Sequence, residues 1–235
     1  MIRWWLIALL TVAAGPRSGY DDASPETRAM QDDDAANPAF LWVEQGEQLW
    51  SAQCSGCHGP IGTMRGVAAR YPAPDPRSGR PVTLEQRVNL CRVDRMGVPA
   101  LRWDDDNLLA LSAAIGLRSR RQVLNVAPDP ALAATGEALF RQRMGQLNLS
   151  CAQCHDDHAG QKLAGSTIPQ GHANAYPTYR LEWQGMGSFY RRLRNCMTGT
   201  RAEPFAPDAP EVAALAHYLA IRARGLTVET PGVRP

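Results

Sequence analysis

Cys54-Ser55-Gly56-Cys57-His58 and Cys151-Ala152-Gln153-Cys154-His155 are the two stretches that decide what this chain becomes. Each has the Cys-x-x-Cys-His spacing of c-type haem attachment, in which two thioether bonds fix the haem edge and the adjacent histidine reaches the iron. One such match is also compatible with a zinc site or a redox dithiol, whereas two matches in comparable contexts favour haem. The sequence therefore predicts two covalently bound haem c groups, with thioether bonds at Cys54, Cys57, Cys151 and Cys154 and with His58 and His155 as iron ligands.

The first residues are typical of a secretory signal peptide. Arg3 supplies the positive end, Trp4–Ala14 forms a short apolar run, and Val12-Ala13-Ala14 is a small-residue cleavage site. An uncleaved membrane anchor is the alternative, but the run is shorter than the roughly 20 apolar residues that a spanning helix needs. We therefore expect a signal peptide over residues 1–14, export of the protein, and no stable membrane insertion.

The formal net charge of the 235-residue chain is only +2, and its basic residues form no long run. Nucleic acid and anionic membrane surfaces are therefore not expected as partners. Hydrophobic residues make up 44% of the chain and charged residues 20%, which is typical of a globular protein. Residues 15–37 are acidic and poor in large apolar side chains, so we expect a flexible acidic leader there.

The same plan occurs twice along the chain, which indicates an internal repeat. An opening helix, at Gly46–Trp50 and again at Gly136–Phe140, leads into each haem motif. The interval from this glycine to the first cysteine is 8 residues in the first copy and 15 in the second, so the second copy contains an insertion around Met144–Ser150. We expect a haem 1 domain over residues 38–127 and a haem 2 catalytic domain over residues 128–235.

After each haem motif comes a Gly/Pro-rich stretch without sustained apolar periodicity, which predicts wrapping loops. A helical segment then ends near a lone cysteine, at Leu84–Cys91 and Ser188–Cys196. An apolar helix closes each copy, at Asn107–Leu117 and Glu211–Ala223. This is the plan of a small class I cytochrome c domain. We therefore predict an all-α fold of two tandem class I cytochrome c-type domains with long wrapping loops.

Cys91 and Cys196 lie at equivalent places in the repeat, where ordinary cytochromes of this class have the methionine that supplies the second iron ligand. We therefore expect Cys91 to ligate the haem 1 iron and Cys196 the haem 2 iron, since thiolate is a known ligand of haem iron. Two alternatives stay open. One is a disulfide between the two cysteines, and the other is ligation by a methionine, for which the candidates are Met96, Met186 and Met197.

An arginine precedes each lone cysteine by four residues, Arg87 before Cys91 and Arg192 before Cys196. Residues four apart share a helix face, so Arg192 should project beside the Cys196 sulfur. A guanidinium binds oxyanions in a bidentate manner. A solvated basic helix face is the alternative, but arginines are denser in the second copy, at Arg191, Arg192, Arg194 and Arg201. This asymmetry predicts that haem 2 is the reactive centre and haem 1 the accessory one.

Several runs in the second copy resemble the SoxA family of cytochromes. These runs are Gly165–His172, Tyr176–Gln184, Arg191–Cys196 and Arg201–Phe205. SoxA proteins are the catalytic cytochrome subunits of the SoxAX complex of bacterial sulfur oxidation. The resemblance covers nearly all of the chain after the signal peptide, and these runs are more specific than the haem motif alone.

The resemblance implies a periplasmic L-cysteine S-thiosulfotransferase, which joins thiosulfate oxidatively to a cysteine of the carrier protein SoxYZ and passes two electrons to haem. It implies that Cys196 is both the distal ligand of haem 2 and the active-site cysteine, held as a persulfide, and that Arg192 binds substrate. It also implies a heterodimer with a SoxX-type cytochrome c. Arg201 is a further candidate for holding the sulfonate of thiosulfate, and His172 is a candidate for the pocket wall.

Three other functions stay open at this stage. A thiosulfate dehydrogenase also has two haems, one of them ligated by cysteine, but it joins two thiosulfates into tetrathionate without a carrier protein. A diheme electron carrier would need no arginine beside a ligand sulfur. A zinc or disulfide protein would carry no haem. The dense match over Arg191–Phe205 favours the SoxA type.

Overall fold

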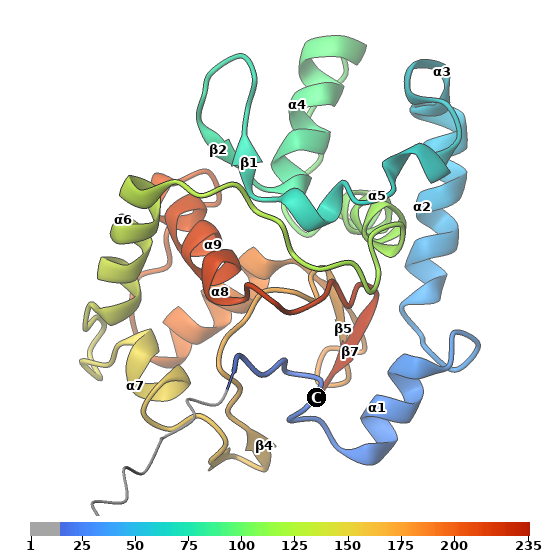
Figure 1. Ribbon diagram of the computed structural model, residues 1–235. Coiled ribbons are helices and arrows are strands. Elements are labelled where there is room, and N and C mark those ends of the chain that lie inside the picture. Colours follow the sequence, from blue (N-terminus) through green and yellow to red (C-terminus); the bar gives the residue numbers. More distant parts are fainter. Residues whose placement is uncertain (1–14) are drawn as a thin grey trace, which may run out of the picture.

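The computed structural model describes residues 15–235, so the expected signal peptide lies outside the described residues. In the described part, no helix is long and apolar enough to cross a membrane. The helices form two groups (Figure 1), with a small sheet between them. One group is built around α2 (Phe40–Gln53) and α5 (Asp106–Leu117), and the other around α6 (Pro130–Arg141) and α9 (Pro210–Arg222).

In the first half of the chain, α2 leads directly into the first haem motif, as the repeat predicted. The elements that follow it, before α5, are α3 (Ser55–His58), the short 3-10 helices η1 (Ile61–Met64) and η2 (Ala68–Arg70), the hairpin strands β1 (Ala73–Pro74) and β2 (Pro81–Val82), and α4 (Leu84–Met96). A capping box starts α4: the Thr83 hydroxyl accepts a hydrogen bond from the Gln86 N–H at 3.3 Å, and the Gln86 side chain accepts one from the Thr83 N–H at 2.8 Å.

The second half repeats this order with longer connections. Between α6 and α9 lie α7 (Cys151–His155), β3 (Lys162–Leu163), β4 (Ser166–Thr167), β5 (Thr178–Arg180), β6 (Gly185–Gly187) and α8 (Phe189–Gly199), and β7 (Gly232–Arg234) follows α9. The expected insertion forms a tight turn, in which Met144 and Leu149 exchange backbone hydrogen bonds of 3.0 and 3.2 Å. The insertion therefore extends a loop and leaves the helices of the repeat intact.

A glycine sits where the two main helices of each half cross. A Cβ at Gly46 would lie 2.0 Å from the Ala110 carbonyl oxygen, and a Cβ at Gly136 would lie 2.2 Å from the Ala214 carbonyl oxygen. No other residue type allows the α2 and α5 backbones, or the α6 and α9 backbones, to approach so closely. The glycine that opens each copy of the repeat thus marks the same helix crossing in both halves.

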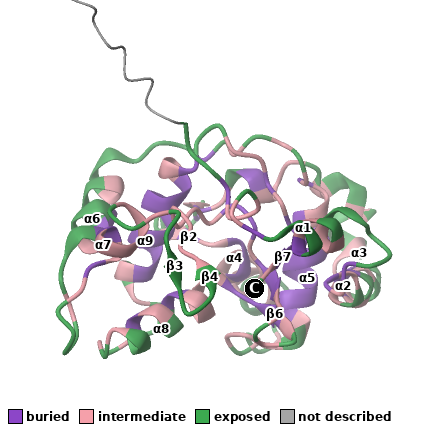
Figure 2. Cartoon of the chain, turned by 90° about the horizontal axis from the view of Figure 1, so that it is seen from below, coloured by how far each residue is buried: buried purple, intermediate pink, exposed green. Residues whose placement is uncertain are grey.

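The sheet joins the two halves. Its order is β6-β5-β7, with β5 antiparallel to β6 and parallel to β7, and the register sets Tyr179 beside Met186 and Val233. These three side chains are buried in one core with Val43 of α2 and Leu109 of α5. Figure 2 shows the buried residues of α5 and β6 in this region. Because the structure contains this and two smaller sheets, the all-α prediction holds only in part.

The expected flexible leader is instead folded. The helix α1 (Pro25–Asp32) packs on β7, where the Gln31 side chain accepts a hydrogen bond from the Val233 N–H at 2.9 Å. Acidic side chains of the leader meet arginines rather than one another, since Asp22 pairs with Arg17 at 2.7 Å and Asp34 with Arg120 at 2.5 Å. The composition of the leader could not show that it folds, because Arg120 and β7 lie far from it in the sequence.

Candidate functional site

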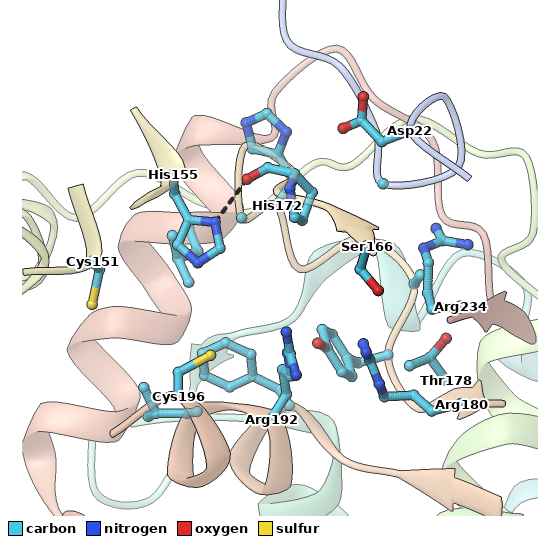
Figure 3. A pocket seen from close by; sticks show the side chains of 18 of the residues that line it. Asp22, Cys151, His155, Ser166, His172, Thr178, Arg180, Arg192, Cys196 and Arg234 are labelled. Carbon is cyan, nitrogen blue, oxygen red and sulfur yellow. Dashed lines mark hydrogen bonds between the residues drawn. The ribbon is translucent and has the colours of Figure 1, made fainter. Parts of the chain in front are cut away.

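A cavity in the second half brings the predicted residues of haem 2 together. It spans about 1140 Å3, part of which is open to solvent. In Figure 3 the His155 ring lies on one side and the Cys196 sulfur on the other, with Cys151 at one end of the space between them. A concave, mostly apolar site of this size suits a large cofactor.

His155 is oriented by the loop that follows it. Its Nδ1 donates to the Pro169 carbonyl oxygen at 2.7 Å, which leaves Nε2 free to face the cavity. Burial lowers the pKa of His155, so the ring is held neutral, which is the form that binds a metal. The loop is wrapped tightly, because a Cβ at Gly171, where φ is +77°, would lie 3.0 Å from the His155 ring.

The opposite side of the cavity is built by α8. Leu193 and Met197 lie on its buried face and pack against Phe140 in the core of the second half. Arg192 and Cys196 lie on the neighbouring face, and both line the cavity. The spacing of four residues therefore brings the guanidinium and the sulfur to one wall, as the sequence predicted.

The start of α8 is fixed from the first half of the chain. The Ser188 hydroxyl accepts a hydrogen bond from the Arg191 N–H at 3.1 Å, which caps the helix. The same hydroxyl donates to Asp104 Oδ1 at 2.5 Å, and Asp104 lies just before α5. The wall that carries Arg192 and Cys196 is therefore anchored across the boundary between the two halves.

Arg192 makes no side-chain hydrogen bond or ion pair with the residues that the structure describes, and its guanidinium points into the cavity. A second arginine, Arg180 of β5, lies nearby. Burial raises the pKa of Tyr176, while Arg192 and Arg180 act in the opposite direction, so both cations lie close to that phenol. Arg192 lies beside the Cys196 sulfur and Arg180 lies farther along the same cavity, so this wall presents two guanidinium groups that can bind anions.

The equivalent residues of the first half lie in a more open setting. Cys54 precedes α3, and Cys57 and His58 are exposed on it. The His58 ring packs at 5.5 Å, centroid to centroid, against Trp50 of α2. Burial raises the pKa of Cys54, and the next contribution comes from Cys91, which therefore lies close to it on α4.

Arg87 occupies the place in the first half that Arg192 has in the second, but its charge is matched. Its guanidinium forms a 2.5 Å ion pair with Asp75, a buried carboxylate between β1 and β2. Hydrogen bonds from Ser78, followed by Arg87, lower the pKa of Asp75 to about 2. This arginine therefore holds the hairpin to α4.

Comparison with known proteins decides the family. The family model described as "SoxA/TsdA, cytochrome c domain" matches residues 41–124 and 135–228, which together hold both halves of the repeat. The chain belongs to the SoxA/TsdA cytochrome c family. The chain is 36% identical to the L-cysteine S-thiosulfotransferase subunit SoxA of Pseudaminobacter salicylatoxidans, covering 97% of this chain and 87% of the relative.

A further relative and a solved structure support the assignment. The SoxA subunit of Paracoccus pantotrophus is 35% identical, with 92% of this chain and 78% of that protein covered. The crystal structure of SoxXA from P. pantotrophus superposes with a TM-score of 0.90 at 34% identity, covering 94% of this chain and 87% of that chain. A cytochrome c domain of this family holds haem c.

The residues of the second half fit that cofactor. Cys151 lies at the end of the cavity, His155 presents a free ring nitrogen, and Cys196 faces it. Two of the three methionines considered as ligands are packed elsewhere, Met197 in the core of the second half and Met186 in the shared core, and Met96 is exposed at the end of α4 in the first half. The structure pairs none of the six cysteines in a disulfide, so it does not contain the alternative bridge between Cys91 and Cys196.

The structure also revises the set of cations expected around the substrate. Arg201 lies just beyond α8 with a φ of +56° and an exposed side chain, and it does not line the cavity. His172 does line it, and its Nδ1 bonds to the Arg17 carbonyl oxygen at 2.7 Å. Sequence reasoning missed Arg180, although it lies in the Tyr176–Gln184 run, because its place depends on the pairing of β5 with β7.

Proposed function

We propose that this chain is the SoxA-type subunit of an L-cysteine S-thiosulfotransferase, built as two cytochrome c domains that each carry one haem c. One observation carries the proposal: the unpaired guanidinium of Arg192 lies on the same face of α8 as Cys196, inside a cavity whose other side is His155. The relatives named for this activity are similar along almost the whole chain.

The proposed substrates are thiosulfate and a cysteine of the carrier protein SoxYZ. The carrier thiol and the thiosulfate dianion form a carrier S–S–sulfonate, and one proton and two electrons are released. Arg192 binds the sulfonate oxygens, which directs the outer sulfur of thiosulfate toward Cys196. Cys196, held as a persulfide, would be the active-site sulfur that this outer sulfur meets, and the two electrons of the net reaction would pass to haem.

The remaining residues hold the site for this chemistry. Cys151 and Cys154 would attach the haem, and His155 and Cys196 would ligate its iron; this haem would supply an electron acceptor beside the reacting sulfur. The Pro169 carbonyl keeps the His155 tautomer fixed. In the first half, Cys54 and Cys57 attach haem 1, and its proposed iron ligands are His58 and Cys91.

The proposed assembly is a periplasmic heterodimer with a SoxX-type cytochrome c. Its support is the similarity to the chain of the SoxXA crystal structure, which covers nearly all of this protein. The partner's haem would receive electrons from the second half and pass them to an external acceptor.

The test uses the complex with its partner and purified carrier protein. Cys196→Met should abolish thiosulfate-dependent conjugation of the carrier cysteine, measured by intact mass, while a haem stain on a denaturing gel shows both haems still attached. Full activity in this variant would contradict the proposal.

Tetrathionate is measured in the same reactions, because the family model is shared with TsdA. The proposal expects carrier conjugation without tetrathionate. Tetrathionate formation without a carrier would instead identify the chain as a thiosulfate dehydrogenase.

A further inference from the structure

The cavity has a polar end that the proposed chemistry at Cys196 does not use. In Figure 3, Cys151 marks one end, and Ser166, Thr178, Arg180 and Arg234 gather at the other. The two attachment cysteines fix one edge of a haem c, and its two propionate groups project from the edge on the far side. The polar end therefore lies where a haem attached at Cys151 and Cys154 would place its carboxylates.

The sheet builds this end by strand alternation. Thr178 and Arg180 are two residues apart on β5, so they point to one face, and Tyr179 points to the other. The register places Arg180 beside Arg234 of β7 and Tyr179 beside Val233. One face of the sheet is thus the apolar core shared by the two halves, and the opposite face presents two guanidinium groups to the cavity.

Arg180 lacks a full set of partners within the described chain. Its side chain is 11% exposed, and its Nε is buried without a hydrogen-bond acceptor. One terminal nitrogen donates to Glu182 at 3.2 Å, but the Glu182 side chain is 54% exposed and faces water. A buried guanidinium with an unmet donor calls for an anion.

The charges around Arg180 also favour an anion beside it. Burial lowers the pKa of Arg180, and the charge of Arg192 lowers it further. Arg234 already pairs with Glu229 and also donates to the Gln31 side chain at 2.6 Å. The acidic Asp22, which also lines the cavity, is paired with Arg17. Arg180 and Arg234 each face one carboxylate, so the demand for an anion at this end rests on the unmet Nε–H of Arg180 and on the nearby charge of Arg192.

We infer that Arg180, with Arg234 and the hydroxyls of Ser166 and Thr178 beside it, forms the binding site for the propionates of haem 2. This inference rests on the proposed attachment of a haem at Cys151 and Cys154. Arg180 lowers the energy of the ionised propionate and, as a cation near the haem, favours its reduced state. Arg192 is left for the substrate anion on the Cys196 side.

The experiment compares Arg180→Ala, Arg180→Lys and Arg191→Ala in the complete complex. Arg191→Ala is the matched control, because the Arg191 guanidinium stacks on the same Trp183 ring, at 4.2 Å against 5.1 Å for Arg180, but does not line the cavity. Two readouts are needed: the midpoint potential of haem 2 as a function of pH, and the dissociation constant for thiosulfate.

Arg180→Ala should lower the potential of haem 2 and make it more dependent on pH over roughly pH 4 to 6, where carboxylic acids titrate. Arg180→Lys should give a smaller shift in the same direction, and Arg191→Ala should match the wild type. Thiosulfate affinity should change less than about threefold in all three. If Arg180→Ala fails to keep its haem, the potential, the pH profile and the thiosulfate affinity of Arg180→Lys are compared with those of the wild type instead.

An unchanged potential and pH profile in both Arg180 variants would overturn the inference. A tenfold or greater loss of thiosulfate affinity without a shift in potential would also overturn it and assign Arg180 to the substrate. Peptide mass analysis of the wild type is done first, because a chain without haem at Cys151 and Cys154 would contradict the proposed function itself.

Discussion

The two halves of the chain share one scaffold but differ in the surroundings of an equivalent arginine. In each half a helix carries an arginine four residues before a cysteine, at Arg87 and Arg192. Asp75 neutralises the first, whereas the second points unpaired into a cavity. His58 is exposed in the first half, whereas His155 is half-buried in the second and its pKa is lowered by desolvation.

The difference teaches that the shared fold does not by itself make the second half the proposed reactive one, since both halves have the same glycine crossing and the same helix order. The connection between the haem motif and the arginine helix selects it. In the first half this connection forms the β1–β2 hairpin, which supplies a carboxylate. In the second it forms strands β3 to β6, which supply another arginine and leave the cavity open.

The largest expected difference between the two halves is seen when each arginine is removed in turn. Arg192→Ala should lower kcat/KM for thiosulfate by roughly 10² to 10³-fold, because a preorganised cation at the substrate is lost. Arg87→Ala should leave kcat/KM within about threefold and instead lower the melting temperature, since Asp75 loses its partner. Steady-state kinetics and calorimetry on both variants measure these effects. Equal losses of kcat/KM would contradict a substrate-binding role for Arg192 alone.

The shared scaffold is tested by adding one methyl group to each crossing. Gly46→Ala and Gly136→Ala should each destabilise the protein by about 1–3 kcal/mol, because the new Cβ would collide with a backbone carbonyl. Denaturant unfolding measures the loss. Gly62→Ala is the control, since nothing lies within 4 Å of the position of its Cβ. A neutral effect at either crossing would show that the two halves do not pack alike.

Helix capping gives a smaller and more selective contrast. Thr83→Ala and Ser188→Ala each remove the N-cap of the arginine helix, so each should cost about 1 kcal/mol of stability. Only Ser188→Ala should also lower kcat/KM, by a few-fold, because α8 loses its link to Asp104 and Arg192 is less well placed. A similar kinetic loss in Thr83→Ala would refute this selectivity.

Acid should weaken the first half through Asp75. Its pKa is lowered to about 2 in the folded protein, against about 3.9 for an unfolded aspartate. Because the pKa of Asp75 is lower in the folded state, its ionised carboxylate stabilises the folded protein above about pH 4. This stabilisation is lost as the pH falls toward 2. The melting temperature of the wild type should therefore drop more steeply over this range than that of Asp75→Asn. Parallel curves for the two proteins would rule out this contribution.

Much of the scaffold could be predicted from the sequence because its signals are local. The haem motifs, the arginine four residues before each cysteine and the apolar closing helices all lie within one or two turns of their partners. The structure places α4, α5, α8 and α9 close to the predicted ranges. The predicted meeting of Arg192 and Cys196 on one cavity wall is found for the same reason, since helical periodicity alone decides it.

The rest depends on contacts between distant residues. Arg180 reaches the cavity only because β5 pairs with β7, which lies 54 residues later. The leader folds because Gln31 meets Val233 and Asp34 meets Arg120. Arg201 follows Arg192 closely in sequence but leaves the cavity, since the chain turns at the end of α8. Single-sequence periodicity contains none of this information.

The core around Tyr179 makes the two copies one thermodynamic unit. Its members come from α2 and α5 of the first half and from β5, β6 and β7, which are spread over the second. Cutting the chain at the boundary of the repeat would expose both faces of this core to water at once. The duplicated motif therefore no longer corresponds to a separable module, and the first half helps to hold the helix that carries Cys196 in place.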